Sequence, residues 1–213
     1  MKKLKILFLI LIIVSCKNAN DTNSKEKAWQ SAESENKTTE NLKTFKLLSN
    51  SDIDISSLDV QGTVVDKRIW DDKNGQNISI FAENGTELYV RHYLIESNEA
   101  KLHSEINDSE KGCDADLTLE FDKESISVTD LDNDNSGEIT FAYRKACISD
   151  VSPKQMNLIM LEEKNQYSLK GQTAVNLGNE TLMEAKIDTT DFSGAPNQFL
   201  NHAKQIWDKI SGK

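Results

Sequence analysis

Proline, glycine and cysteine are scarce in this chain, and no apolar run is long enough to cross a membrane. The 213 residues include 2 Pro, 9 Gly and 3 Cys, which excludes collagen-like and other Gly- and Pro-rich proteins. The longest apolar stretch is about ten residues, whereas a membrane-spanning helix needs about 20. Basic residues number 25 against 35 acidic ones, for a formal net charge of -10. Because an acidic surface repels a phosphate backbone, the composition argues against a nucleic-acid partner.

The first sixteen residues have the pattern of a secretory leader. Three lysines within the first five residues precede an apolar run at 4–14, which ends at Ser15-Cys16. The segment 13–16 resembles the lipobox of bacterial lipoproteins. That resemblance implies that residues 1–15 are a signal peptide that is removed, and that Cys16 carries acyl chains such as palmitate. Two or three such chains hold a protein in the bilayer almost permanently. The alternative is an ordinary secretory signal with an incidental cysteine.

Export decides how the other two cysteines are interpreted. Disulfides persist outside the cytosol, so Cys113 and Cys147 are predicted to form a bridge, with two buried free thiols as the alternative. A metal site built on these two cysteines is not indicated, because neither has a Cys or His neighbour at ligand spacing. Loss of the leader removes three lysines and makes the net charge -13.

Two regions of different composition follow the leader. Residues 16–50 comprise the lipidated cysteine and a segment rich in Asn, Ser, Thr, Lys and Glu without a sustained hydrophobic period, which indicates a flexible tether. Residues 51–213 form a single domain in which apolar residues alternate in short runs. The predicted fold class is mainly β, an antiparallel and sandwich-like arrangement with one amphipathic helix at the C-terminus.

Turn signals divide the domain into strands. Asn84-Gly85 predicts a hairpin turn, and a second turn is expected at 96–99 between strands at 87–95 and 100–106. The polar run 122–125 is interpreted as a turn between two further strands, and 162–165 as another. These turns would connect neighbouring antiparallel strands.

The one strong helical pattern is C-terminal. Pro196 suits the first turn of a helix, where its missing N–H costs nothing. An apolar stripe continues to Ile210 at helical spacing, which predicts a helix that covers the sheet like a lid. A helix lying on a membrane surface is the alternative, but Lys204 and Lys209 are its only cations and Asp208 stands beside them.

The strongest chemical feature is an acidic loop between two predicted strands. Alternate carboxylates in a curled loop can converge on one Ca²⁺, which takes six to eight oxygen ligands. The loop resembles the Asp-x-Asp-x-Asp loops of FG-GAP calcium modules, and an EF-hand register fits less well because Tyr143 occupies the position of the last Glu. The alternative is a solvated acidic turn without an ion. The expected calcium ligands are Asp130, Asp132, Asp134, Ser136 (through its carbonyl) and Glu138.

Catalytic motifs are absent from the sequence. None of the three histidines lies within five residues of another, and there is no GxSxG, Walker or GxGxxG motif, although a pair of distant carboxylates could still meet in the fold. His92 is predicted to be a hydrogen-bonded core histidine, His103 to lie on the polar strand face, and His202 to lie on the helix. Trp70 is either a residue at the edge of the core or an exposed ring on which a sugar stacks. The sequence therefore leaves enzymatic activity open and favours none.

One family resemblance covers several of these features. The lipobox, the tether and the stretch 130–160 are together similar to small flavobacterial (Bacteroidota) lipoproteins linked to surface polysaccharide biosynthesis. The resemblance implies an envelope location, lipid-anchored and on the outer membrane, with a surface glycan or another envelope protein as partner beside the bilayer. Two hypotheses result. The first is a calcium-stabilised binding or scaffold module, and the second is an accessory protein or enzyme of surface-polysaccharide assembly.

Overall fold

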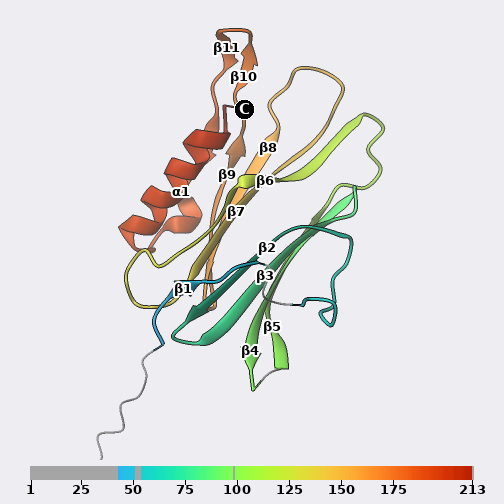
Figure 1. The fold of residues 1–213 in the computed structure, drawn as a ribbon. Coiled ribbons are helices and arrows are strands. Elements are labelled where there is room, and N and C mark those ends of the chain that lie inside the picture. Colours follow the sequence, from blue (N-terminus) through green and yellow to red (C-terminus); the bar gives the residue numbers. More distant parts are fainter. Residues whose placement is uncertain (1–42, 51–53, 98, 213) are drawn as a thin grey trace, which may run out of the picture. The chain divides into compact units, whose positions relative to one another are not determined.

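The structure of this chain is a computed structural model that describes residues 43–50, 54–97 and 99–212, all within one compact unit spanning residues 40–213. It confirms a mainly β fold with one C-terminal helix (Figure 1). In chain order the elements are β1 (Lys46–Leu47), β2 (Thr63–Asp72), β3 (Gly75–Glu83), β4 (Glu87–Glu96), β5 (Glu99–Ser109), β6 (Asp116–Thr129), β7 (Glu138–Ile148), β8 (Gln155–Glu162), β9 (Asn165–Gln172), β10 (Val175–Leu177), β11 (Glu180–Met183), β12 (Lys186–Asp188), the 3-10 helix η1 (Thr190–Phe192) and α1 (Asn197–Ile210).

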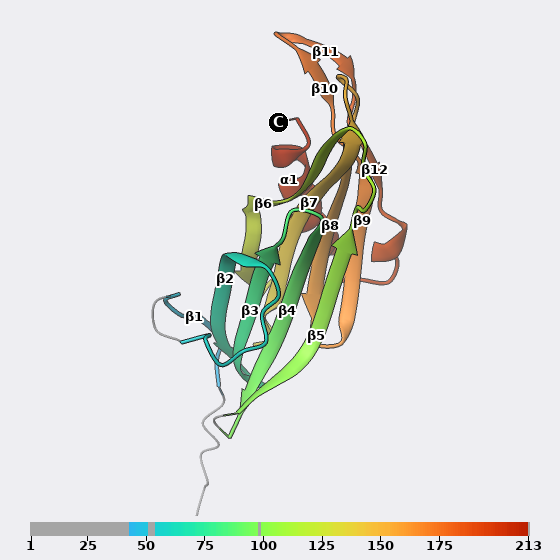
Figure 2. The ribbon, with the colours of Figure 1, turned by 90° about the vertical axis from the view of Figure 1, so that its right-hand side faces the viewer.

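The strands build two five-stranded antiparallel sheets that pack face to face (Figure 2). The first sheet has the order β1-β2-β3-β4-β5, and the second has the order β12-β9-β8-β7-β6. Strands that follow one another in the chain are neighbours in both sheets, except at β12, so short turns suffice to connect them. The hairpin of β10 and β11 pairs with neither sheet and projects beyond the second one in both ribbon views.

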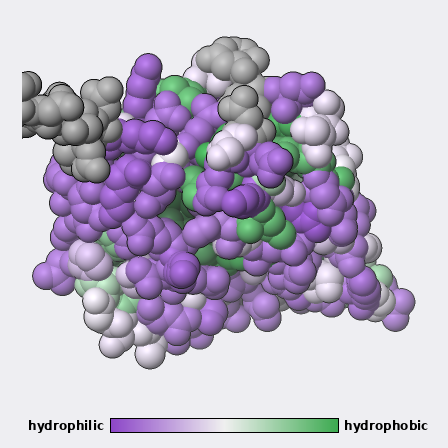
Figure 3. Space-filling view, turned by 90° about the horizontal axis from the view of Figure 1, so that it is seen from below, coloured by the Kyte–Doolittle hydropathy of each residue, from purple (hydrophilic) through white to green (hydrophobic). Residues whose placement is uncertain are grey.

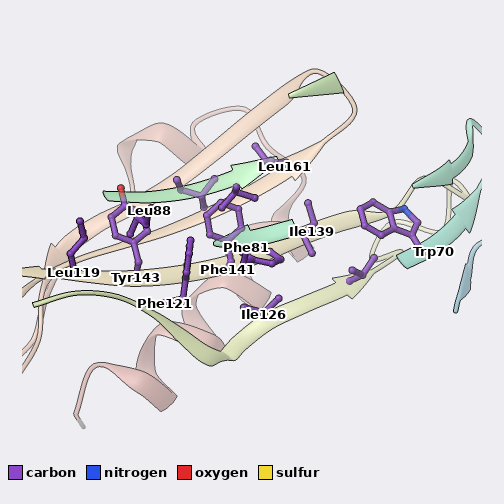
Figure 4. Close-up of a cluster of buried hydrophobic side chains, with 13 residues drawn as sticks. Trp70, Phe81, Leu88, Leu119, Phe121, Ile126, Ile139, Phe141, Tyr143 and Leu161 are labelled. Atoms are coloured by element: carbon purple, nitrogen blue, oxygen red, sulfur yellow. The ribbon is translucent and has the colours of Figure 1, made fainter. Parts of the chain in front are cut away.

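Thirteen buried side chains fill the space between the two sheets (Figure 4). Phe81 of the first sheet meets Phe121 and Phe141 of the second edge to face, with ring centroids 5.4 and 5.3 Å apart. Trp70 lies at one end of this cluster, and Leu119 and Tyr143 lie at the other. Because burial of one large apolar side chain contributes about 1.5–3 kcal/mol, this layer is the main source of the sandwich's stability.

The helix α1 covers the other face of the second sheet. Phe199, Ala203, Trp207 and Ile210 are buried at helical spacing and pack on a cluster that includes Met156 and other residues of β8. The predicted lid on the sheet is therefore confirmed. Pro196 is the N-cap residue, one position before the first helical turn in which it was expected.

The end of the segment that sequence analysis assigned to the tether belongs to the first sheet. In β1, Lys46 pairs with Asp71 and Leu47 with Trp70, so the chain joins the sheet before the expected domain boundary at residue 51. Leu48 packs against the outer face of β2, β3 and β4 together with three residues that follow the expected boundary, namely Ile55, Leu58 and Val60. The short run of polar residues that follows Leu48 hid this contribution from composition alone.

Three of the four predicted turns are confirmed, and the fourth is wrong. Turns connect β3 to β4, β4 to β5, and β8 to β9 as expected. The polar run 122–125 instead lies inside the single strand β6, where the pairing register shifts between Asp122 and Ser127. There the Ser125 hydroxyl donates to the Asp122 carbonyl (2.6 Å) and accepts from the Ala142 N–H (2.6 Å). These bonds hold the extra residues as a bulge on the same strand, so the chain continues instead of reversing.

A disulfide bridge joins Cys113, in the connection before β6, to Cys147 near the end of β7. The predicted pairing is confirmed, and the bridge links residues 34 positions apart. It fixes the start of β6 to the strand with which β6 pairs, at Leu117 opposite Cys147.

Candidate metal centre

The acidic loop between β6 and β7 is tightly curled and fastened to the first sheet. Asn133 and Asn135 adopt left-handed backbone angles, with φ of 61° and 64°, which asparagine tolerates better than most residues. The Lys73 N–H donates to the Asn135 carbonyl (2.8 Å), and the Gly137 N–H donates to Asp72 Oδ2 (3.2 Å). The turn between β2 and β3 thus holds the loop in place.

A first group of carboxylates comes from the loop itself. Asp130, Asp132 and Glu138 each offer one oxygen, and these oxygens lie within 4.8 Å of one another. Glu138 is fully buried, and its Oε2 accepts from Thr129 Oγ1 (3.0 Å) and the Leu131 N–H (2.9 Å). Its Oε1 and Asp130 Oδ1 are both buried without a hydrogen-bond partner. Leaving a buried anionic oxygen unpaired is costly, and three carboxylates this close together could hold a cation.

A second group shares Asp132 and brings in a residue that sequence analysis missed. Asp132, Asp134 and Glu162 also place one oxygen each within 4.8 Å of one another. Glu162 ends β8, and the pairing of Ile139 with Leu161 places it beside the start of β7. Only the register between two separate strands makes Glu162 a neighbour of the loop, so no local spacing in the sequence could reveal it.

Burial, and to a smaller extent the neighbouring carboxylates, shift the ionisation of these groups. Burial, with a smaller contribution from the charge of Asp132, raises the pKa of Glu138 to about 7 against the hydrogen bonds from Leu131 and Thr129. Burial also raises the pKa of Glu162, with Asp132 and Asp134 adding to the effect. A divalent cation among these oxygens would remove the repulsion.

Lys73 already neutralises the outer side of the loop. Its ammonium donates to Asp134 Oδ2 (2.5 Å) and pairs with Glu163 Oε1 at 3.1 Å. Burial opposes the ionisation of Asp134, but the bonds from Lys73 and the Ser136 N–H outweigh it and lower the pKa of Asp134. The least compensated oxygens are therefore on the inner side, at Glu138 and Asp130.

The five predicted ligands are thus placed unequally. Asp130, Asp132 and Glu138 form the first group, and Asp134 lies in the second. Ser136 is buried, its N–H donates to Asp134 Oδ1 (2.7 Å), and its hydroxyl donates to Glu163 Oε1 (3.5 Å). Its side chain contributes to neither group, and the expected use of its carbonyl stays a prediction.

A pocket of about 390 Å³ opens beside the loop, between the ends of the two sheets. Ser136 and Gly137 of the loop line one side of it, and Asn77, His92 and His103 of the first sheet line another. Figure 3 views the domain from below Figure 1, the end at which β4 turns into β5. That surface is largely hydrophilic, with apolar side chains in small areas only. Among the residues that line the pocket, only Leu94 and Gly137 lack a polar side chain, so the pocket is suited to a polar guest.

The structure tests the predictions for two aromatic residues near the pocket, Trp70 and His92. Trp70 is fully buried, and its indole N–H donates to Asp72 Oδ2 (3.0 Å), so it is a core residue and offers no face to a sugar. His92 is a buried, hydrogen-bonded histidine as predicted, with Nε2 2.9 Å from Asn77 Oδ1. Burial lowers the pKa of His92 to about 3, helped by the charge of His103.

The other two histidines differ in outcome. His103 was expected on the polar face of its strand, and this is wrong, because it lines the pocket and contacts the Glu163 carbonyl across the gap between the sheets at 2.8 Å. His202 lies on α1 as predicted, with Nε2 3.5 Å from Ser127 Oγ.

Cys16, the leader and most of the tether lie outside the described residues, so lipidation and an envelope location stay predictions. Within residues 43–50, 54–97 and 99–212, no helix is long and apolar enough to span a membrane.

Comparison with known proteins adds no relative from which a role could be inferred. No protein-family model, no curated protein and no solved structure matches this chain.

Proposed function

We propose that this protein is a binding or scaffold module of the cell envelope, anchored through Cys16 and stabilised by Ca²⁺ in the acidic loop. The observation that carries the proposal is the buried carboxylate of Glu138. Its Oε1 has no hydrogen-bond partner among the described residues, and one of its oxygens lies within 4.8 Å of oxygens of Asp130 and Asp132. A cation that supplied the missing partner would convert a destabilising cluster into a cross-link.

Calcium suits the donor set better than a transition metal. Both groups consist of carboxylate oxygens, which are hard ligands and favour Ca²⁺ or Mg²⁺. Glu162 and the main-chain carbonyls of the curled loop could raise the number of oxygens toward the six to eight that Ca²⁺ takes. Loops of this kind in extracellular modules bind with dissociation constants of about 10⁻⁴ to 10⁻³ M, which calcium outside the cell can saturate.

The position of the loop supports a structural role for the ion. Asp72 and Lys73 connect the loop to the turn between β2 and β3, and Glu162 ends the strand before the turn between β8 and β9. An ion here would fasten both sheets at one end of the sandwich. It would also fix Ser136 and Gly137 on the pocket wall, so the bound ion would shape a binding surface.

Thermal unfolding in the presence and absence of calcium tests the proposal. The protein is residues 17–213, which keeps everything after the expected lipidated cysteine, in EDTA or in about 10 mM CaCl₂. At 100-fold excess over the dissociation constant, ligand linkage stabilises by about 2.7 kcal/mol. For a domain of this size that is a midpoint rise of roughly 5–10 °C. An equal response to 10 mM MgCl₂ would assign the site to Mg²⁺ instead.

Two variants make the test specific. Glu138→Gln keeps the shape of the side chain and removes its charge. It should abolish the calcium response and also raise the midpoint in EDTA, because a buried uncompensated charge is gone. Asp116→Asn makes the same change of net charge at an exposed strand residue and should respond to calcium like the parent. A parent that does not respond to calcium would reduce the loop to a solvated acidic turn.

The second hypothesis, a role in surface-polysaccharide assembly, receives less support from the geometry. It would be favoured by a pocket that combines Trp70 with two free carboxylates. Trp70 is buried, and both oxygens of Asp72 on the pocket wall already accept hydrogen bonds, Oδ1 from the Asn74 N–H and Oδ2 from Trp70 and Gly137. Screening of the purified protein against glycans would therefore be needed to support a glycan partner.

A further inference from the structure

A bulge in β5 places two histidines side by side in the pocket. His92 pairs with Ser104 and Tyr93 pairs with Leu102, so His103 is the extra residue between them. A one-residue bulge reverses the side to which the following side chains point and can re-aim the residue it contains. The ring of His103 consequently lies 5.2 Å from the ring of His92, centroid to centroid, and both rings line the pocket.

Both imidazoles use the same nitrogen for a hydrogen bond to a carbonyl-type oxygen. The side-chain nitrogen of Asn77 donates to the Gly75 carbonyl, so Asn77 Oδ1 is free to accept, and His92 Nε2 donates to it (2.9 Å). The Glu163 carbonyl can only accept, so His103 Nε2 donates to it (2.8 Å). With Nε2 protonated in each neutral ring, both Nδ1 atoms carry lone pairs.

The lone pair of His92 has nothing to bind within the described part of the chain. The residue is 6% exposed, and its Nδ1 is buried without a hydrogen-bond partner. Its cross-strand neighbours Ser79 and Ser104 also have buried hydroxyls without partners. Of these three residues His92 lines the pocket, and a buried ring nitrogen without a partner beside a cavity indicates a site that a guest could complete.

We propose that His92 and His103 together bind one divalent transition-metal ion, such as Zn²⁺, through their Nδ1 atoms. Imidazole nitrogens bind Zn²⁺ at about 2.0–2.1 Å, which places two rings on one tetrahedral ion with their centres about 5 Å apart, as these two rings are. Asn77 and Glu163 act as the outer partners that metal-binding histidines normally have.

The charge and size of the pocket suit a hydrated metal ion. Asp72 and Glu163 face it with Lys164 as the one cationic residue on its wall. A volume of about 390 Å³ leaves room for water molecules to complete the coordination and for a small exogenous ligand. Nitrogen donors distinguish this site from the acidic loop, so the inference does not rest on calcium binding there.

Titration calorimetry with ZnCl₂ tests the proposal on residues 17–213, with about 10 mM CaCl₂ present to occupy carboxylate sites. The parent is expected to bind one equivalent of Zn²⁺. His103→Ala should weaken the affinity by more than about 100-fold, beyond the roughly 10- to 100-fold that loss of an outer partner costs. His92→Ala should do the same, and His202→Ala removes a histidine outside the pocket and should leave the affinity unchanged.

A second measurement protects the test against misfolding of the His92 variant. Because His103 is an exposed residue, His103→Ala alone is decisive if the buried variant fails to fold. Cu²⁺ substituted into the parent should show two nitrogen ligands by electron paramagnetic resonance, and His103→Ala should show one. Zinc binding that is equally strong in parent and His103→Ala would overturn the proposal. So would the absence of stoichiometric binding, which would leave the pocket to ordered water. Neither result would affect the calcium-dependent melting.

Discussion

Gly137 in the acidic loop lies directly against the indole of Trp70 in the core. A Cβ at position 137 would stand 2.3 Å from Trp70 Nε1 and 2.7 Å from its Cδ1, which is closer than side chains approach. Both residues also bind Asp72 Oδ2, through the indole N–H and the Gly137 N–H. The packing of the core and the shape of the candidate metal loop are thereby made interdependent.

Replacement of Gly137 by alanine should therefore disturb both regions. The added methyl must displace the loop or a fully buried ring, and overpacking of this kind costs about 1–3 kcal/mol. Urea unfolding should show this loss, and the calcium-dependent rise in midpoint should shrink in the same variant. Gly212→Ala is the control, because a Cβ there meets nothing within 4 Å. Unchanged stability in Gly137→Ala would mean that the loop can shift away from Trp70 without an energetic cost.

Reduction of the disulfide should destabilise the domain without changing its fold class. The bridge between Cys113 and Cys147 closes a loop of 34 positions, and in the chain-entropy treatment this contributes roughly 3–4 kcal/mol. The double variant Cys113→Ser/Cys147→Ser should unfold at lower denaturant concentration than the parent. A reducing agent should shift the parent to the same midpoint and leave the double variant where it is. Equal midpoints for oxidised and reduced parent would contradict the expected contribution.

Trp207 should be the residue on which the docking of α1 depends most. It is 2% exposed and lies in the cluster between the helix and the second sheet. Truncation of a buried Trp to Ala costs about 3–5 kcal/mol, so Trp207→Ala should lower the unfolding midpoint strongly and increase hydrogen exchange along α1. The exposed Lys204→Ala, on the same helix, should change neither quantity.

Stability should fall in mild acid partly through His202. Burial lowers the pKa of His202 below its ordinary 6.5, so the unfolded chain takes up a proton at higher pH than the folded one does. The stability that the fold has with His202 neutral is therefore fully present above about pH 6.5. It is lost progressively as the pH falls toward the pKa of His202 in the folded state. Urea unfolding in EDTA at several values between pH 7 and 5 should show a steeper loss for the parent than for His202→Gln. Identical slopes would mean that His202 takes up its proton equally in both states.

Local patterns in the sequence predicted most of the architecture because each depends on neighbours in the chain. Alternation located the strands, Asn84-Gly85 located a turn, and the apolar stripe up to Ile210 located the helix. The turn expected at 122–125 failed because Ser125 forms hydrogen bonds on both sides that keep β6 continuous. Such bonds to a residue 17 positions away leave no trace in local composition.

For the same reason, only some residues of the candidate sites could be predicted from the sequence. Carboxylates at alternate positions pointed to the loop, whereas Glu162 joined it through the register of β7 and β8. His103 was assigned to the wrong face because strict alternation assumes an uninterrupted strand, and a bulge of one residue breaks that count. A site assembled from several strands needs the pairing register, which one sequence does not contain.

The pairing of β1 has a mechanical consequence for a protein held at its N-terminal end. Tension on a membrane anchor at Cys16 would enter the described domain through β1. This strand pairs with β2 at Lys46 and Leu47, and the Leu48 N–H adds one bond to the Ile69 carbonyl (2.9 Å). So short a pairing would peel away before the longer strands β2 to β5 yield. Residues 46–50 would then detach first under load, while the second sheet, which the bridge from Cys113 to Cys147 reinforces, stays folded.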